Sequence, residues 1–268
     1  MAAILFDLDG VIYESDRLIA GAADTVNWFI DSGTPYLFLT NTTSRPRSEL
    51  VKKLADFGID TNEEKFLTPA VAATQWLRTQ SVRNIALFVP ETTRDEFSGF
   101  VDLTEARDND DDISLEAVIV GDLGEGWTFA KMNQIFRLLI ENPEARLLAL
   151  GMTRYWRTQS GLQMDVGPMI KAFEYATDRN AVVTGKPSKD FFDAAARLLK
   201  DEDIVMIGDD IRGDVEASQN AGLTAILVKT GKFADTDLDT GIKPDAVLES
   251  IAQLPAWWHN NMKPIPGV

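Results

Sequence analysis

Two short apolar stretches, far apart in the chain, both end in aspartates. Residues 2–6 lead into Asp7-Leu8-Asp9-Gly10, and residues 204–208 lead into Asp209-Asp210. Continuous apolar stretches of this length are typical of strands buried on both faces of a parallel sheet. Charge is costly at the end of a buried strand unless it has a partner or a task. The pattern therefore predicts two strands that direct carboxylates to one place, although a solvated acidic turn at residues 7–10 is an open alternative.

Strand-like and amphipathic helical stretches alternate at both ends of the chain, which is the pattern of an α/β protein. The sequence predicts a Rossmann-like, doubly wound parallel sheet as the core, formed by residues 1–78 and 180–268. Residues 79–179 have strands and helices of their own, and we expect an inserted α/β cap domain that acts as a substrate lid. The core strands are expected at residues 2–6, 36–39, 181–183, 205–207 and 225–228, and its helices at 22–31, 46–57, 69–77, 188–199 and 213–220.

Composition removes several classes of enzyme. The chain has no cysteine, and its single histidine is His259. These counts exclude disulfides, thiolate chemistry, a phosphohistidine enzyme, a Ser-His-Asp hydrolase and a multi-histidine zinc site, so any metal would have oxygen ligands. The net charge of −16 argues against partners that are nucleic acids or anionic membranes. No stretch is long and apolar enough to span a bilayer and no basic leader is present, so a cytoplasmic location is expected.

The predicted strand ends carry a chemically coherent set of side chains, at the edge where open parallel sheets bind ligands. Besides the acidic turns, Thr40 and Asn41 follow the strand at 36–39, and Lys186 follows the strand at 181–183. A carboxylate can attack phosphorus, a hard divalent cation can offset crowded negative charge, and hydroxyl, amide and ammonium donors can bind phosphoryl oxygens. The set favours phosphoryl transfer. Helix capping by Thr40 and Asn41, and a surface turn for Lys186, are the alternatives.

Four motifs in this order resemble those of the haloacid dehalogenase superfamily. They are DLDGVIY at residues 7–13, LTN at 39–41, GKP at 185–187 and GDDIRGD at 208–214. The insertion between the second and third motifs resembles the type IIA cap of p-nitrophenylphosphatase-like members. Residues 41–44, 174–177 and 229–233 are similar to the subgroup of the phospholysine phosphohistidine inorganic pyrophosphate phosphatases. The resemblance implies a Mg²⁺-dependent phosphatase that acts on small phosphorylated compounds, with esters, pyrophosphate and phosphoamides as candidates.

The resemblance also implies roles for the two aspartates of the first motif. Asp7 would be the nucleophile that carries an aspartyl phosphate. Asp9 would protonate the leaving group and later activate water. This division is chemically sound, because the nucleophile must stay ionised while the second carboxyl has to exchange a proton.

The remaining motif residues would bind the cation and the phosphate. By the resemblance, Mg²⁺ is bound by the Asp7 carboxylate, the Asp9 main-chain carbonyl and the Asp209 carboxylate, with Asp210 and Asp214 supporting from behind; Thr40, Asn41 and Lys186 bind the phosphoryl oxygens. A helix cap is the alternative for Asp209 and for Asp214.

Other activities and contacts stay open at this point. A phosphotransferase or phosphomutase would use the same motifs with another acceptor, and a non-enzymatic receiver-like phosphoacceptor would lack a use for Asp9 and for the insertion. The cap resemblance implies a homodimer. In the insertion, Arg154-Tyr155-Trp156 and residues 161–167 are candidates for contacts with the leaving group, with aromatic core packing as the alternative. Trp257-Trp258 is expected to pack onto the core.

Overall fold

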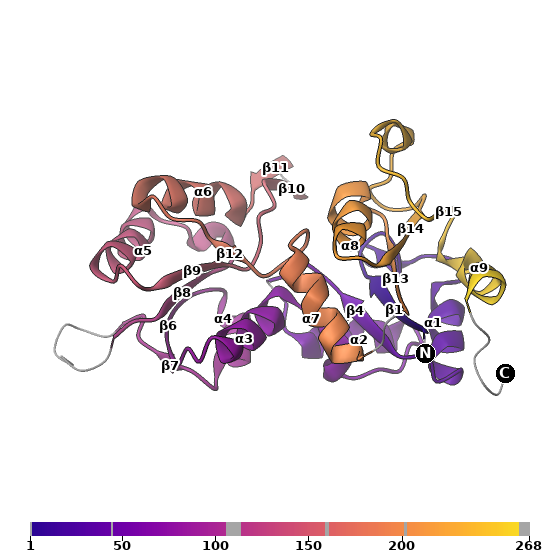
Figure 1. Cartoon of the computed structure of the whole chain (residues 1–268), viewed down its shortest axis with the longest axis horizontal. Coiled ribbons are helices and arrows are strands. Elements are labelled where there is room, and N and C mark those ends of the chain that lie inside the picture. The colour runs from indigo at the N-terminus through magenta and orange to yellow at the C-terminus, as the bar shows by residue number, and fades with distance from the viewer. Residues whose placement is uncertain (1, 44, 106–113, 159–160, 201–202, 263–268) are drawn as a thin grey trace. The chain divides into compact units, whose positions relative to one another are not determined.

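A computed structural model describes the chain except for residues 1, 44, 106–113, 159–160, 201–202 and 263–268. Contacts divide the chain into two compact units, whose elements are labelled in Figure 1. The first unit comprises Met1–Thr40, Arg47–Leu67 and Lys186–Val268. The second comprises Asn41–Pro46 and Thr68–Gly185.

The first unit is built on a six-stranded parallel sheet with the order β15-β14-β13-β1-β4-β5. Its strands are β1 (Ala2–Asp7), β4 (Tyr36–Leu39), β5 (Phe66–Leu67), β13 (Asp203–Gly208), β14 (Thr224–Val228) and β15 (Ala246–Leu248). The two apolar stretches that end in aspartates are the central neighbours β1 and β13. Their register pairs Phe6 with Ile207, so the residues that follow lie side by side at the carboxyl edge.

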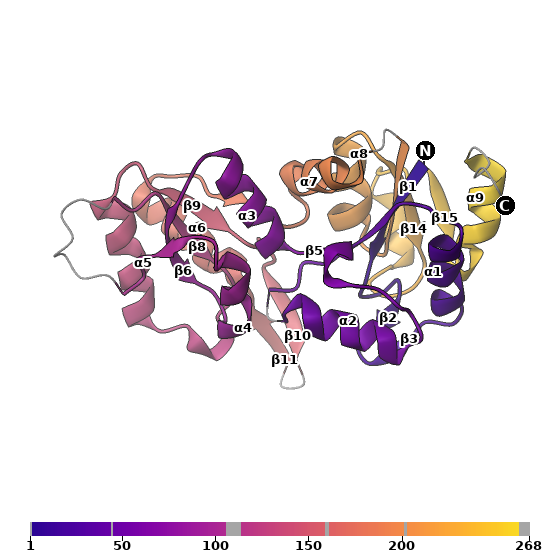
Figure 2. The ribbon, with the colours of Figure 1, turned by 90° about the horizontal axis from the view of Figure 1, so that it is seen from below.

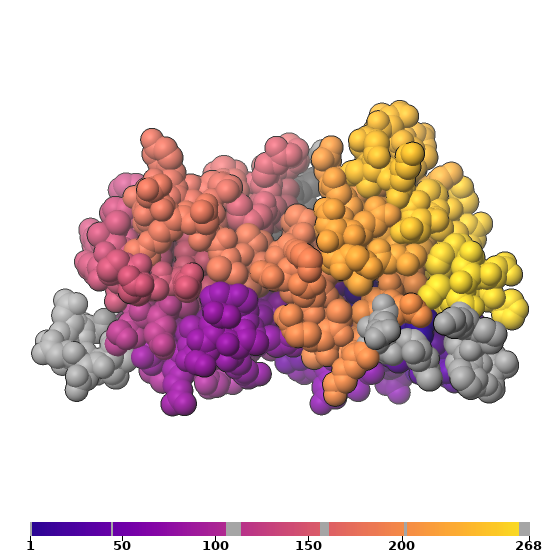
Figure 3. Space-filling view, viewed as in Figure 1, coloured from indigo at the N-terminus to yellow at the C-terminus, as the bar shows by residue number. Residues whose placement is uncertain are grey.

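Helices cover both faces of this sheet. Figure 2 shows α1 (Ala22–Asp31) and α2 (Arg47–Asp56) on one face, and α7 (Lys189–Leu199) and α8 (Ala217–Asn220) on the other. The unit is completed by the π-helix η4 (Ile211–Glu216), the C-terminal helix α9 (Leu254–Asn261), the 3₁₀ turns η1 (Glu63–Lys65), η5 (Asp235–Asp239) and η6 (Ile251–Gln253), and a hairpin of β2 (Tyr13–Glu14) and β3 (Arg17–Leu18). The gold segment that contains η5 protrudes from the surface of this unit (Figure 3).

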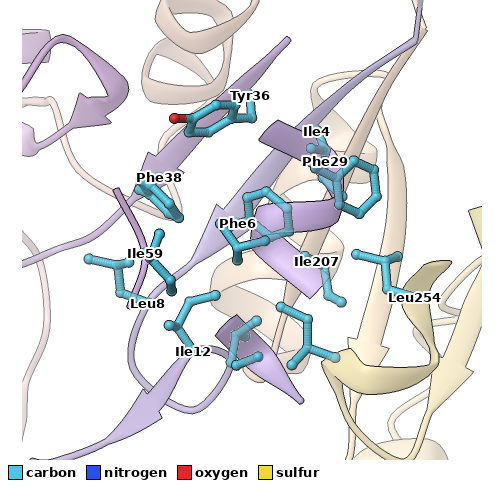
Figure 4. Packing of buried hydrophobic residues seen from close by; sticks show 14 of the residues in the cluster. Ile4, Phe6, Leu8, Ile12, Phe29, Tyr36, Phe38, Ile59, Ile207 and Leu254 are labelled. Carbon is cyan, nitrogen blue, oxygen red and sulfur yellow. The ribbon is translucent and has the colours of Figure 1, made fainter. Parts of the chain in front are cut away.

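Aromatic side chains fill the core between the sheet and α1. Alternate residues of β1 point to opposite faces, and Ile4 and Phe6 point into this core (Figure 4). The Phe6 ring centroid lies 5.5 Å from that of Phe29 and 5.8 Å from that of Phe38. Trp258 of α9 packs edge-on against Phe29 at 4.8 Å and is 2% exposed, which confirms the predicted packing of the tryptophan pair for this residue.

The second unit has its own parallel sheet with the order β12-β9-β8-β6-β7. Its elements are α3 (Pro69–Thr79), β6 (Asn84–Phe88), α4 (Glu91–Arg94), η2 (Asp95–Phe97), β7 (Val101–Asp102), β8 (Ala117–Val120), η3 (Gly124–Gly126), α5 (Phe129–Glu141), β9 (Arg146–Ala149), the hairpin β10 (Tyr155–Thr158) and β11 (Gly161–Met164), α6 (Val166–Thr177) and β12 (Val182–Val183). Ile135 of α5 and Ile170 of α6 pack on one face, and Leu77 of α3 packs on the other. No helix in the described part of either unit is long and apolar enough to cross a membrane.

The two parallel sheets with flanking helices confirm the predicted α/β fold class. The contacts divide the chain at residues that differ from the predicted domain bounds. The second unit begins at Thr68 rather than at residue 79, because α3 packs through Ala73 and Leu77 on Ile85 of that unit's sheet. It ends at Gly185 rather than at residue 179, because β12 pairs with β9 and not with a core strand. The short core strands β5 and β15 were not predicted.

Replacing Phe6 tests the aromatic core. We expect Phe6→Ala to lower the free energy of unfolding by about 3–5 kcal/mol, because it removes a fully buried ring and leaves a cavity between Phe29 and Phe38. Urea unfolding followed by circular dichroism measures the change. Leu238→Ala, at an exposed position of the same unit, should stay within about 0.5 kcal/mol of the wild type. Equal effects of the two variants would contradict the packing described here.

Candidate functional site

Three buried carboxylates meet at the carboxyl edge of the first unit's sheet. Asp7 is the last residue of β1, Asp209 follows β13, and Asp214 lies on η4. They are 6%, 1% and 1% exposed, and one oxygen from each lies within 4.8 Å of the others. The cluster arises because β1 and β13 are adjacent and in register, so their acidic ends cannot lie apart. Asp7 therefore does not belong to a solvated acidic turn.

Lys186 neutralises part of this charge. Its Nζ donates to Asp7 Oδ1 and to Asp214 Oδ1, both at 2.7 Å, and the residue is 6% exposed. The surface-turn alternative for this lysine is therefore wrong. Burial favours the neutral amine, but the charges of Asp214 and Asp7 outweigh burial and raise the pKa of Lys186, so the side chain is a cation. The strand before it, β12, belongs to the second unit's sheet, and Lys186 begins the final segment of the first unit.

The negative charges of Asp7 and Asp214 near Asp209 exceed the positive charge that the protein places beside them. Burial, followed by the charges of Asp7 and Asp214, raises the pKa of Asp209 to about 8. Burial and the charge of Asp7 also raise the pKa of Asp214, although Lys186 opposes that rise. Asp209 Oδ1 is buried and has no hydrogen-bond partner among the described residues. An orphaned carboxylate oxygen beside two further carboxylates fits a hard divalent cation, which prefers such ligands.

The other oxygen of Asp209 is held by a segment that sequence reasoning did not select for the site. Lys232 N donates to Asp209 Oδ2 at 2.6 Å, and a Cβ on either Gly10 or Gly231 would overlap the same oxygen. Both glycines have positive φ, +85° and +64°, so glycine suits these positions for conformation as well as for space. The signal was available, because residues 229–233 follow β14, the neighbour of β13 in a parallel sheet.

Asp210 caps η4, and Asp209 does not. Asp210 Oδ1 accepts from Arg212 N at 3.0 Å and from Gly213 N at 2.8 Å. Burial tends to raise its pKa, but the hydrogen bond from Gly213 and the charge of Lys232 outweigh burial and lower it. The cap alternative is therefore wrong for Asp209, because Asp210 is the cap, and for Asp214, which lies inside the helix with its carboxylate on Lys186.

Asp9 stands apart from the buried cluster. It is exposed, one residue before Gly10, whose amide donates to Tyr13 O at 2.7 Å. That bond closes the turn between β1 and the β2–β3 hairpin. An exposed carboxylate at this turn can exchange protons with solvent, as an acid-base group must.

Thr40 and Asn41, although consecutive in the chain, are assigned to different units. Thr40 is 9% exposed, directly follows β4, and its amide donates to Leu67 O at 3.3 Å. Asn41 belongs to the second unit and lies beside Gly185. Because α2 begins only at Arg47, neither residue caps it, and the capping alternative is wrong.

The residues predicted to contact the leaving group lie on the β10–β11 hairpin of the second unit, directly before it and directly after it. Tyr155 is 56% exposed and pairs with Met164, which is 60% exposed, so core packing does not explain this tyrosine. Arg154 is exposed, and the side chain of Trp156 lies outside what the structure describes. Of the candidate residues 161–167, Gly161–Met164 form β11 and the last two begin α6. Asp165, between them, caps α6 by accepting from Val166 N.

Comparisons with known proteins agree with this architecture. The family model of the haloacid dehalogenase-like hydrolases matches residues 4–100, and a HAD-hydrolase-like model matches residues 183–254. Phospholysine phosphohistidine inorganic pyrophosphate phosphatase of Homo sapiens is 37% identical over 257 residues, 93% of this chain and 91% of that protein. Haloacid dehalogenase-like hydrolase domain-containing protein 2 of Rattus norvegicus is 35% identical over 88% of this chain and 87% of that protein.

A solved structure gives the same result at the level of the fold. The p-nitrophenyl phosphatase from Archaeoglobus fulgidus matches with a TM-score of 0.84 and 26% identity, covering 95% of this chain and 98% of that one. The two family models together span every residue of the carboxylate cluster and Lys186. The predicted resemblance to the superfamily is confirmed.

Removing the ammonium group of Lys186, which Asp7 and Asp214 share, should destabilise the fold. We expect Lys186→Met to lower the free energy of unfolding by about 3–5 kcal/mol near neutral pH, because it leaves Asp7 and Asp214 buried without their partner. The loss should be smaller at about pH 5, where protonation of Asp214, whose pKa is already raised, relieves the repulsion. Urea unfolding at both pH values measures this. Lys189→Met, at an exposed lysine paired with Asp193, should change little at either pH.

Asp209 should cost stability in the metal-free protein. Its raised pKa means that the folded chain binds a proton more tightly than the unfolded chain does, so this contribution to stability is present at low pH and is lost as the pH rises through about 8. Asp209→Asn should therefore raise the melting temperature at about pH 9 more than at about pH 5, by about 2–4 °C for each kcal/mol gained. Thermal unfolding in the presence of a chelator measures the difference.

Asp210→Asn is the matched control with the opposite sign. The pKa of Asp210 is lowered, so its ionised carboxylate stabilises the fold above the pKa of the unfolded chain. The substitution should lower the melting temperature at about pH 9. If both variants shift it in the same direction, the charge balance assigned to this site is wrong.

Proposed function

This chain belongs to the haloacid dehalogenase-like hydrolase family, and from that premise we propose that it is a Mg²⁺-dependent phosphatase acting on small phosphorylated compounds. The observation that carries the proposal is the carboxylate cluster itself. Asp7 is held at the end of β1 by Lys186, beside Asp209, one buried oxygen of which has no hydrogen-bond partner in the described part of the chain. This arrangement offers a nucleophile, a place for a cation and a donor for an anion within a single sheet edge.

The cation would be held by oxygen ligands that the chain already collects. The carboxylates of Asp7 and Asp209 and the main-chain carbonyl of Asp9 are the proposed ligands, with Asp210 and Asp214 in support. When bound, Mg²⁺ would offset the negative charge of the cluster and of the phosphoryl group. Asp214 is a poorer ligand because one of its oxygens accepts from Lys186 and the other from Asp210 N at 3.2 Å.

The proposed reaction proceeds in two displacements at phosphorus. A carboxylate oxygen of Asp7 forms a bond to phosphorus while the bond to the leaving oxygen or nitrogen breaks, and Asp9 gives its proton to the leaving atom. Water then attacks the phosphorus of the aspartyl phosphate, Asp9 takes a proton from that water, and the bond to Asp7 breaks. Thr40, Asn41 and Lys186 would donate to the phosphoryl oxygens. Asp7 and Asp9 thus end the cycle as they began it.

The proposed substrate class is supported by the comparisons rather than by the cluster. The relative at 37% identity is named for phospholysine, phosphohistidine and inorganic pyrophosphate. The similar solved structure is named as a p-nitrophenyl phosphatase. We propose that this chain cleaves P–O bonds of small esters and of pyrophosphate, with P–N bonds as the finer candidate.

Phosphate release from a panel of substrates tests the proposal. The panel contains p-nitrophenyl phosphate, pyrophosphate, phospholysine and a phosphohistidine peptide, each with Mg²⁺ and with a chelator. We expect Mg²⁺-dependent release, and a loss of at least about 10³-fold with Asp7→Asn, which keeps the shape of the side chain and removes the nucleophile. Asp203→Asn is the control, since this exposed aspartate lies at the opposite end of β13.

The same assay separates hydrolysis from its alternatives. Asp9→Asn should slow turnover by about 10²–10⁴-fold and let the aspartyl phosphate accumulate, which acid-quenched mass spectrometry detects. Release that survives Asp7→Asn would refute the covalent route. Phosphate transfer to added alcohols in place of release would identify a phosphotransferase, and a stable aspartyl phosphate on the wild type would identify a receiver-like module.

A further inference from the structure

We propose that residues Thr230–Lys232, the loop after β14, are positioning residues that aim Asp209 at the divalent cation. The inference rests on the proposed function, because it assigns Asp209 as a cation ligand. It adds a part of the chain that supplies no ligand of its own. Lys232 contributes its main-chain amide, Gly231 contributes the space left by its missing Cβ, and Thr230 contributes its hydroxyl.

The first contact fixes one oxygen of Asp209 and leaves the other free for the cation. Lys232 N donates to Oδ2 at 2.6 Å, while Oδ1 is buried without a partner among the described residues. A carboxylate held by one oxygen cannot rotate without losing that bond. The bond thus keeps the carboxylate where one of its oxygens lies within 4.8 Å of an oxygen of Asp7 and of an oxygen of Asp214.

The second contact is steric. Gly231 lies against the Asp209 carboxylate. A Cβ added to Gly231 would also lie only 2.5 Å from the Cα of Gly10. The Cβ of any other residue would overlap Oδ2 and push the carboxylate away from its position. Three chain segments thus meet at this oxygen: the turn after β1, the end of β13 and the loop after β14.

The third set of contacts fastens the loop to the turn that carries the nucleophile. The Thr230 hydroxyl donates to Gly10 O, and Gly231 N donates to Glu14 Oε1 at 3.0 Å. Because Gly10 follows Asp9 directly, the loop holds Asp209 and the turn with Asp7 and Asp9 in one arrangement. Polar groups of this kind, which orient a metal ligand, typically change metal affinity by about 10–100-fold when they are altered.

A pair of glycine variants tests the steric contact. We expect Gly231→Ala to raise the Kd for Mg²⁺ by at least about tenfold, measured by isothermal titration calorimetry and by the Mg²⁺-dependent shift in melting temperature. Gly33→Ala is the matched control: Gly33 has a similar φ, +69° against +64°, and a Cβ there meets nothing within 4 Å. It should carry the same backbone strain and keep the Kd within about twofold. Equal Kd values for the two variants would overturn the proposal.

Two further substitutions assign the effect to individual groups. Thr230→Val should raise the Kd for Mg²⁺ by about three- to tenfold, and Thr230→Ser, which keeps the hydroxyl, should restore it. Lys232→Met keeps the amide and removes a cation 3.5 Å from Asp210, so it should not weaken Mg²⁺ binding. Weakening by Lys232→Met as large as that by Gly231→Ala would place the effect in the ammonium and overturn the role of the main chain.

Kinetics separate this inference from the proposed function. With the wild type active, a positioning role predicts that Gly231→Ala raises the Mg²⁺ concentration for half-maximal rate and leaves KM for substrate nearly unchanged at saturating Mg²⁺. If the wild type is active and Gly231→Ala does not change this Mg²⁺ concentration, the positioning role is refuted and the proposed phosphatase function is not. A wild type that binds Mg²⁺ and releases no phosphate refutes the phosphatase, while the Kd values of the variants still decide the positioning role.

Discussion

Repulsion among three buried carboxylates is the constraint on which the rest of the first unit depends. Asp7, Asp209 and Asp214 lie within one small cluster, and the described structure gives them one buried ammonium, that of Lys186. Such a cluster opposes folding unless the surrounding structure holds it together. The stability comes from elsewhere in the unit, from the long apolar strands β1 and β13 and from the aromatic core around Phe6.

The means by which the cluster is held are distributed over several elements. The register of β1 and β13 sets the spacing of Asp7 and Asp209, and the cap on η4 sets the position of Asp214. Lys186 enters from the segment that returns from the second unit. The loop after β14 closes the remaining side through main-chain amides and glycine. A site built this way places its charged groups on rigid elements, which is what preorganised chemistry requires.

The sequence predicts these features to different degrees, for physical reasons. Long apolar stretches that end in aspartates identify β1 and β13 because periodicity and charge agree there. The two-residue strand β5 carries too little pattern to be predicted at all. The strand β12 is predicted at residues 181–183, but two residues do not show which sheet it joins. The contribution of Lys232 is equally hidden, because its hydrogen bond to Asp209 comes from a main-chain amide that almost any residue could supply. Strand adjacency could have located this loop, but not its contacts.

The charge balance also bears on the order of events in the proposed reaction. With Asp7, Asp209 and Asp214 ionised, Lys186 leaves two negative charges unbalanced, in a chain whose net charge is −16. A phosphoryl group brings further negative charge, so its approach to this cluster is unfavourable in low dielectric surroundings. Two positive charges would balance the cluster. Asp209 Oδ1, which has no hydrogen-bond partner among the described residues, would favour the binding of a cation before that of an anion. The proton that occupies Asp209 at lower pH, given its raised pKa, fills the same role in the metal-free protein and has to leave before the cation binds.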